Sequence, residues 1–156
     1  MLILAGAEQE TSAAQARLKK LIASGEGLQV FTRWLAAQGG DPQVVEDLSL
    51  LPTAPIVTQV QSSKRGYVGA WHTEALGLTS MRLGAGRAQK GDPIDHGVGL
   101  VIEKKIGDWV ETGDIIAQVY ARSQAEAAVA VDEVLAEVEL TPTPPPVLPL
   151  VIGYII

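Results

Sequence analysis

The fold is decided by Gly97-Val-Gly-Leu-Val-Ile-Glu-Lys-Lys-Ile-Gly-Asp-Trp-Val-Glu-Thr-Gly-Asp-Ile-Ile-Ala-Gln-Val119, residues 97–119 of the chain. Apolar residues alternate from Val98 to Ile102, which is the period of a half-buried strand. Gly107-Asp108 and Gly113-Asp114 follow, and apolar residues come after each pair. Glycine adopts positive φ angles and aspartate hydrogen-bonds the backbone of its own turn. The stretch therefore predicts short strands joined by tight turns, in a small curved sheet or barrel.

The composition limits the classes of protein that fit. The chain has 156 residues and is 47% hydrophobic, which predicts one domain with a real core, with or without a helical appendage. A net charge of −6 without a long basic run argues against nucleic acid as the main partner. The absence of cysteine excludes disulfides and fits a reducing compartment, so we expect a cytoplasmic protein. No membrane partner is expected, because no apolar run reaches the length of a membrane span.

Helical spacing dominates the first third of the chain. A capping box at Ser12–Gln15 predicts a helix that Gly25 ends. A second helix is predicted from about Gly27 to Gln38, and a pair of glycines follows it. Proline after an aspartate then predicts a short helix over Asp41–Asp47.

The period changes from Pro55 onward. Ile56–Gln61 and Gly66–Trp71 are predicted strands, and Thr73 is predicted to cap a helix. A second capping box, Ser123–Glu126, starts a helix with an apolar stripe. The residues assigned to this stripe are Ala127, Val131, Val134, Leu135 and Val138. Helices followed by strands with helices between them predict an α+β fold rather than a doubly wound parallel sheet.

The loop at Gly84–Asp95 holds the candidate ligand residues. They are Gly84, Gly86, Arg87, Asp92 and Asp95. Nearby glycines expose backbone N–H groups and the arginine adds charge, which is typical of an anion-binding loop. The structural alternative is a helix C-cap followed by turns, because the loop follows a helix instead of preceding one. His72 and His96 are interpreted as turn or surface residues, and no catalytic residue, metal site or cofactor is predicted.

One resemblance is local. Residues 101–119 resemble half of the motif of lipoyl and biotinyl carrier domains, in which such turns build a barrel-sandwich hybrid. Those carriers hold their cofactor on a lysine at an exposed hairpin tip, and no lysine follows Lys105 here. A carrier module stays one alternative, and a stand-alone binding module that uses Gly84–Asp95 as its ligand loop is another.

A second resemblance covers nearly the whole chain. The segments that carry it are Ala36–Asp41, Leu50–Pro52, Gly66–Val68, Leu83–Arg87, Asp92–Gly99 and Lys104–Asp108. In this order they resemble the C-terminal part of the pyrimidine-nucleoside phosphorylase and thymidine phosphorylase family. The resemblance implies that residues 1–40 end the family's central domain and that residues 41–54 are a linker. Residues 55–140 would be an α/β-hammerhead domain with a barrel-sandwich-hybrid core, and the proline-rich, apolar tail at 141–156 departs from the family.

The resemblance also implies a function. The family are glycosyltransferases of pyrimidine metabolism and nucleoside salvage, which use phosphate to split thymidine or uridine into free base and (deoxy)ribose 1-phosphate. Its Lys-His-Ser phosphate loop and its Arg, Ser and Lys base clamp are both missing from this sequence. We therefore expect a chain that is catalytically silent alone and that packs against the rest of the phosphorylase chain. Phosphate and nucleoside would bind only to the full-length parent, and self-association through the helices before Gly39 is expected.

Overall fold

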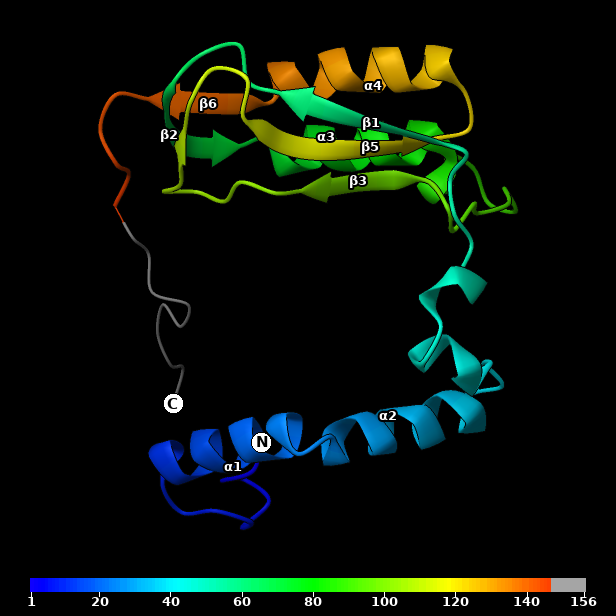
Figure 1. The fold of residues 1–156 in the computed structure, drawn as a ribbon, viewed down its shortest axis with the longest axis vertical. Coiled ribbons are helices and arrows are strands. Elements are labelled where there is room, and N and C mark those ends of the chain that lie inside the picture. The colour runs from blue at the N-terminus through cyan, green and yellow to red at the C-terminus, as the bar shows by residue number, and fades with distance from the viewer. Residues whose placement is uncertain (147–156) are drawn as a thin grey trace. The chain divides into compact units, whose positions relative to one another are not determined.

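A computed structural model describes residues 1–146 of the chain (Figure 1). They form two compact units, Met1–Leu51 and a second unit that begins at Pro52. The apolar tail expected at 147–156 lies outside the described residues.

The first unit contains helices α1, Thr11–Ala23, and α2, Glu26–Ala37. Gly25 separates them with a φ of 79°. The predicted capping box at Ser12–Gln15 is wrong, because α1 begins one residue before Ser12 and its N-cap is Glu10, which makes no side-chain cap bond. Ser12 therefore already lies inside the first helical turn, where its hydroxyl is not placed to cap that turn.

Two 3-10 helices follow α2. They span Pro42–Val45 and Leu48–Leu50. The side chain of Asp41 accepts a hydrogen bond of 2.9 Å from the backbone N–H of Gln43. Asp47 caps the second helix in the same way through the N–H of Ser49, also at 2.9 Å. The helix predicted from Asp41 is confirmed in position, but Asp47 starts a new turn and divides the segment in two.

The second unit is built from two antiparallel sheets of three strands. The first has the order β1-β5-β3, with β1 at Ile56–Gln61, β5 at Ile115–Ala121 and β3 at Gly99–Ile102. The second has the order β4-β2-β6, with β4 at Trp109–Val110, β2 at Gly66–Trp71 and β6 at Val138–Thr141. Helices and antiparallel sheets together confirm the predicted α+β class.

The two Gly-Asp turns form backbone hydrogen bonds with β2 and with Ser62, which directly follows β1. Gly107 has a φ of 95°, its N–H donates to the carbonyl of Val68 at 2.8 Å, and the carbonyl of Asp108 accepts from the N–H of Val68 at 2.9 Å. Gly113 has a φ of 92° and bonds in the same manner to the carbonyl of Ser62 at 2.8 Å. Because positive φ favours glycine, these turns explain why the stretch from Gly97 organises the unit.

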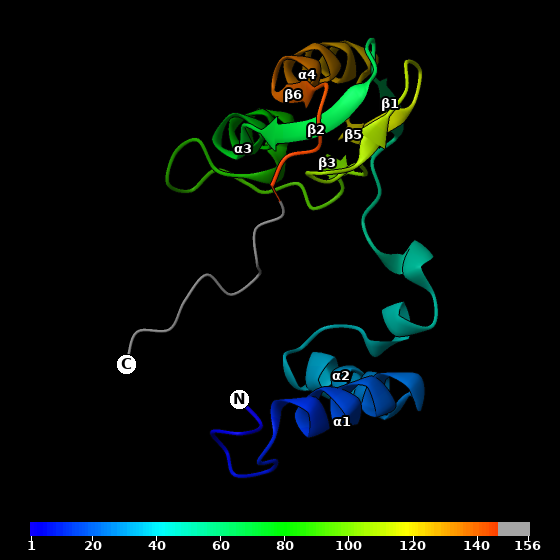
Figure 2. The same cartoon turned by 90° about the vertical axis from the view of Figure 1, so that its left-hand side faces the viewer.

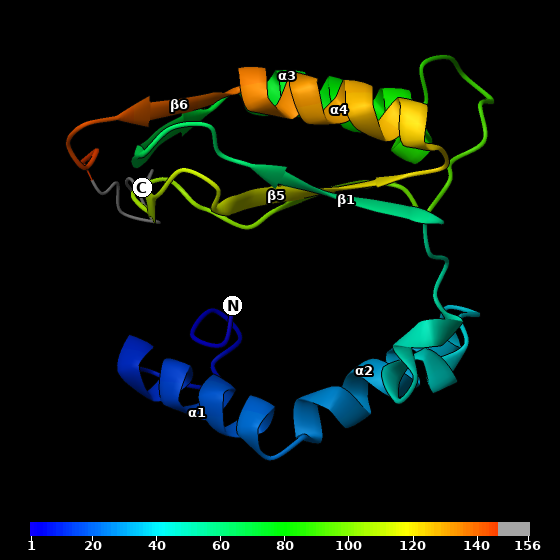
Figure 3. The ribbon, with the colours of Figure 1, turned by 45° about the horizontal axis from the view of Figure 1, so that its top comes forward.

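Helices α3, Thr73–Ser80, and α4, Gln124–Ala136, lie side by side on one side of the strands (Figures 2 and 3). α4 packs against β1 and β5. Thr73 is the first residue of α3 rather than its cap, since the N-cap is His72. The buried core side chains are Val60, Val68, Leu76, Leu83, Val98, Val110, Ile116, Ala117, Val119, Ala121, Ala127, Ala130 and Val134.

The end of α4 differs from the prediction. Val138, which was assigned to the apolar stripe of the helix, begins β6 and lies opposite Trp71. Thr141, which was expected to begin the proline-rich, apolar tail, is the last residue of β6 and lies opposite Tyr67. Pairing with β2 gives these residues backbone hydrogen-bond partners. The resulting stabilisation is larger than the local preference for helix that the apolar spacing indicates.

Candidate functional site

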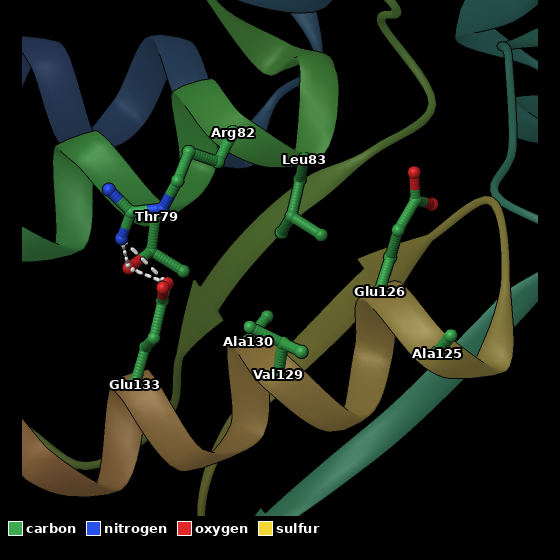
Figure 4. A pocket seen from close by; sticks show the side chains of 8 residues that line it. All are labelled: Thr79, Arg82, Leu83, Ala125, Glu126, Val129, Ala130 and Glu133. Carbon is green, nitrogen blue, oxygen red and sulfur yellow. Dashed lines mark hydrogen bonds and ion pairs between the residues drawn. The ribbon is translucent and has the colours of Figure 1, made fainter.

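A groove of about 330 Å³ runs between α3 and α4 (Figure 4). Its apolar lining consists of Leu83, Ala125, Val129 and Ala130. Its polar lining consists of Thr79, Arg82, Glu126 and Glu133. An apolar floor with a few polar groups at its edges is the usual composition of a small-molecule site.

One end of the groove is closed by a three-residue polar network (Figure 4). Arg82 Nη2 lies 2.7 Å from Glu133 Oε2 and donates to Thr79 Oγ1 at 3.1 Å. Thr79 Oγ1 in turn donates to Glu133 Oε2 at 2.6 Å. The threonine is 2% exposed, so its hydroxyl depends on these partners instead of water.

The network favours the ionised form of Glu133. The hydrogen bond from Arg82, followed by that from Thr79, lowers the pKa of this carboxyl group below its ordinary value of 4.5. Burial opposes the change by disfavouring the charged form, but it is the smaller effect. A lowered pKa in the folded chain means that ionised Glu133 stabilises the fold.

This linkage predicts a pH-dependent stability. Because the folded pKa is the lower one, the contribution of Glu133 is complete above the unfolded pKa and is lost as the pH falls through the folded pKa. We expect Glu133→Gln to lower the free energy of unfolding at neutral pH, and the difference from wild type to shrink below pH 4.5. Urea denaturation across this range measures the difference. Glu74→Gln, an exposed change on α3, serves as the control, and a difference for Glu133→Gln that does not vary with pH would contradict the prediction.

Glu126 forms another part of the groove wall (Figure 4). Its Oε1 accepts from Arg122 Nη2 at 3.2 Å, and its Oε2 is buried without a hydrogen-bond partner among the described residues. Its backbone N–H donates to Ser123 Oγ at 3.2 Å, which confirms one half of the predicted capping box. The carboxylate bonds Arg122 rather than returning to the backbone of Ser123.

The candidate loop begins where α3 ends in the wide helical turn Met81–Ala85. Gly84 lies within this turn with a φ of 110°, and its carbonyl accepts from the N–H of Asp95 at 2.9 Å. A Cβ atom at Gly84 would lie 3.4 Å from Arg122 Nη2. The structure therefore brings the two ends of the predicted loop together beside an arginine that the sequence did not single out.

The other candidate residues bond mainly within the loop. Arg87 Nε donates to the carbonyl of Asp92 at 3.2 Å, and Asp92 Oδ2 accepts from the N–H of Gln89 at 2.8 Å. Asp95 Oδ1 accepts from the N–H of Gly97 at 3.0 Å, while Gly86 has an extended backbone. These bonds are those of aspartate-stabilised turns. None of the five candidates lines the groove, and their ligand role stays a prediction.

Sequence reasoning missed the groove for a physical reason. Arg82 and Glu133 are 51 residues apart, and each alone is an ordinary charge on a helix. Helical spacing places Thr79 of α3 and Leu83 of the turn that follows on one face, but it does not reveal which helix that face meets.

Other classes of site have little support in the described part of the chain. Residues 1–146 contain no group of three or more His, Asp or Glu side chains that could hold a metal ion. His72 Nε2 instead lies 3.0 Å from Glu139 Oε1, and both side chains are exposed. None of the helices within the same range is long and apolar enough to cross a membrane.

Comparisons of the sequence with a family model and with individual proteins both indicate the pyrimidine-nucleoside phosphorylases. A sequence model of the family described as "Pyrimidine nucleoside phosphorylase C-terminal domain" matches residues 67–141. The chain is 42% identical over 120 residues to a pyrimidine-nucleoside phosphorylase of Geobacillus stearothermophilus, covering 76% of this chain and 28% of the relative. The Bacillus subtilis protein of that name is 38% identical over 138 residues, covering 88% of this chain and 31% of the relative. The chain thus spans less than a third of the length of these relatives.

Proposed function

Because the chain belongs to the pyrimidine-nucleoside phosphorylase family, as its C-terminal domain, we propose that it supports phosphorolysis of pyrimidine nucleosides as a structural part of the enzyme. In this reaction a phosphate oxygen forms a bond to C1′ of thymidine or uridine. The bond from C1′ to the base breaks, and its electron pair leaves with the base. The products are free base and (deoxy)ribose 1-phosphate. The observation that carries the proposal is the identity of 38–42% to proteins named pyrimidine-nucleoside phosphorylase.

The structural role is inferred from the side chains of the groove and of the candidate loop, which are engaged with one another or with their own turns. Phosphorolysis needs groups that position phosphate and stabilise charge on the departing base. The polar side chains of the groove bond mainly one another, and the aspartates of the candidate loop hold its turns. The sequence also lacks the phosphate loop and the base clamp of the family that it resembles. We therefore assign catalysis to the part of the relatives that this chain does not match.

We infer that the second unit corresponds to the family's α/β-hammerhead domain with a barrel-sandwich core. Two sheets of short antiparallel strands, with hydrogen-bonded turns at Gly107 and Gly113, support this assignment. In this view the unit shapes the enzyme around an active site whose residues lie elsewhere in the polypeptide.

A two-part experiment tests the proposed function. The purified chain is expected to release no thymine or uracil from thymidine or uridine in the presence of phosphate. A chimera in which this chain replaces the matched region of the Geobacillus stearothermophilus phosphorylase is expected to retain phosphorolysis, because a related C-terminal domain would then pack against the rest of the enzyme. Deletion of that region is the control and should abolish activity. Turnover by the chain alone, or a folded but inactive chimera, would contradict the proposal.

The first unit exposes the surface that we assign to packing against the rest of the phosphorylase. Helix α2 buries no residue, and its Leu28, Phe31 and Trp34 side chains are 53%, 46% and 56% exposed. On α1, Ile22 is 78% exposed. Contiguous apolar surface of this kind marks a protein–protein contact.

In the isolated chain this surface is expected to drive self-association. Light scattering should show a mass above that of the monomer, which is 16.4 kDa. The double change Phe31→Ser and Trp34→Ser should shift the chain toward monomer, because it removes the two aromatic side chains of α2. Val129→Ser removes an exposed apolar side chain from α4 and is the matched control. A wild-type chain that is monomeric at all concentrations would contradict the expectation.

A further inference from the structure

The β1-β5-β3 sheet has an outer face, on the side away from α4, that remains exposed in the described part of the chain (Figure 3). We propose that this outer face docks against the rest of the phosphorylase chain, and that a hollow in it receives a large apolar side chain of that partner. The inference rests on the proposed function and adds a second docking surface to that of α2.

The strand register defines the outer face. Residues directly opposite one another share a face of an antiparallel sheet, and successive residues alternate between faces. On the inner face, Val60 and Val119 are 0% exposed and belong to the core that α4 completes. The outer face therefore consists of two rows across the sheet, which are Val57, Tyr120 and Gly99 in one and Gln59, Gln118 and Val101 in the next.

The outer face is uncharged. None of the residues of β1, β5 and β3 is charged, although 19% of the chain is. Val57 and Val101 are nevertheless 51% and 43% exposed. Sheets that stay in water usually carry polar residues outward and charged residues on their edge strands, which here are β1 and β3. An uncharged and partly apolar face is instead typical of the centre of a protein–protein interface.

A hollow of about 360 Å³ opens on the outer face. Val57, Val101 and Tyr120 line it together with the segment 52–54. This segment lies close against Gly97, where a Cβ atom would come within 3.0 Å of the carbonyl carbon of Thr53. Pockets of this kind hold the aromatic or aliphatic anchors that contribute most to interfaces.

The polar side chains of the outer face already have hydrogen-bond partners. The Tyr120 hydroxyl donates to Gln118 Oε1 at 3.3 Å, and Gln118 Nε2 donates to Glu103 Oε1 at 2.6 Å. Unpaired polar groups are costly to bury, whereas bonded ones are not. The face can therefore be covered without leaving these groups unsatisfied.

The length of the relatives indicates which partner covers the face. The chain matches only 28% and 31% of two phosphorylases, so most of each relative lies outside the matched region. The hollow also includes Pro52, at which the second unit begins, so along the chain it adjoins the unit whose apolar helix we assign to the same partner. Helix α4 is a poorer candidate for such a contact, because it carries Glu126, Asp132 and Glu133.

Cysteine labelling tests whether the face is covered. The chain has no cysteine, so Val101→Cys introduces one reporter thiol. In the chimera with the Geobacillus stearothermophilus phosphorylase, maleimide should label this position at least about tenfold more slowly than in the isolated chain. Ala128→Cys, at an exposed position of α4 outside the groove, is the control and should react equally in both. Mass spectrometry of the labelled peptides gives the rates.

Charged variants test the contact itself. Val57→Lys combined with Val101→Lys should lower phosphorolysis by the chimera about tenfold or more, because docking would bury two unpaired charges. Circular dichroism of the isolated chain should stay native, since both positions are exposed there. Ala128→Lys should change neither property. If the double variant does not fold, the labelling rates decide alone.

The outcomes separate this inference from the proposed function. Equal labelling of Val101→Cys in an active chimera and in the isolated chain would overturn the inference and leave the proposed function intact. Slow labelling in a folded but inactive chimera would support docking and contradict the proposed function. Labelling of the isolated chain that slows as its concentration rises, or quickens when residues 147–156 are removed, would identify a second copy or the chain's own tail as the occupant and would overturn the inference.

Discussion

Replacing Ile116 by alanine is expected to lower the free energy of unfolding of the sheet-containing unit by about 2–5 kcal/mol. Ile116 is 0% exposed and lies on β5, the central strand of the β1-β5-β3 sheet. Truncation removes apolar contact area and leaves a cavity that the surrounding strands and α4 fill only in part. This loss is a large share of the total stability of a small unit.

Ile106→Ala is the matched control for this prediction. It removes the same atoms from a side chain that is 59% exposed, so we expect a change within about 0.5 kcal/mol. Urea denaturation followed by far-ultraviolet circular dichroism gives both values. Similar losses for Ile106→Ala and Ile116→Ala would show that the core is not where the structure places it.

Gly84→Ala is expected to destabilise the chain by about 1–3 kcal/mol. The backbone at Gly84 has a φ of 110°, a conformation that residues with a Cβ atom rarely adopt. The new Cβ would also lie 3.4 Å from Arg122 Nη2, which is ordinary contact and adds little. Backbone strain is therefore the main cause, and the substitution should loosen the loop that Gly84 and Asp95 close.

Gly77→Ala provides a control of opposite sign. Gly77 lies within α3, and a Cβ atom there would meet nothing within 4 Å. Alanine is the better helix former by about 0.5–1 kcal/mol, so this change should stabilise the chain. Thermal unfolding of the two variants distinguishes them, and a Gly84→Ala variant as stable as wild type would exclude a strained backbone at that position.

Local signals were sufficient for the bounds of several elements. The strands at Ile56–Gln61 and Gly66–Trp71 and the Gly-Asp turns were all predicted, because strand period and turn chemistry depend on near neighbours in sequence. Local reasoning failed at Val138, whose periodicity fits the preceding helix although it pairs with Trp71 on β2. A partner so distant in sequence leaves no local signal.

The candidate loop could be predicted from the sequence, whereas the groove could not. The loop from Gly84 to Asp95 was identified from its glycines and charges, and the structure joins its two ends. The groove was not predicted, because it exists only where α3 meets α4 and brings Arg82 to Glu133. The exposed face of α2 was anticipated from the family resemblance, which implied a missing packing partner.

The sequence by itself determined the family, the α+β class and the Gly-Asp turns that organise the second unit, since each depends on residue types at short spacing. The tertiary structure alone decided that β1 and β2 enter different sheets and that Val138 belongs to a strand. It also decided that Thr79, Arg82 and Glu133 meet at a groove with an apolar floor. These features depend on pairing and packing between segments far apart in the chain, where the free energy of contact rather than local propensity selects the arrangement.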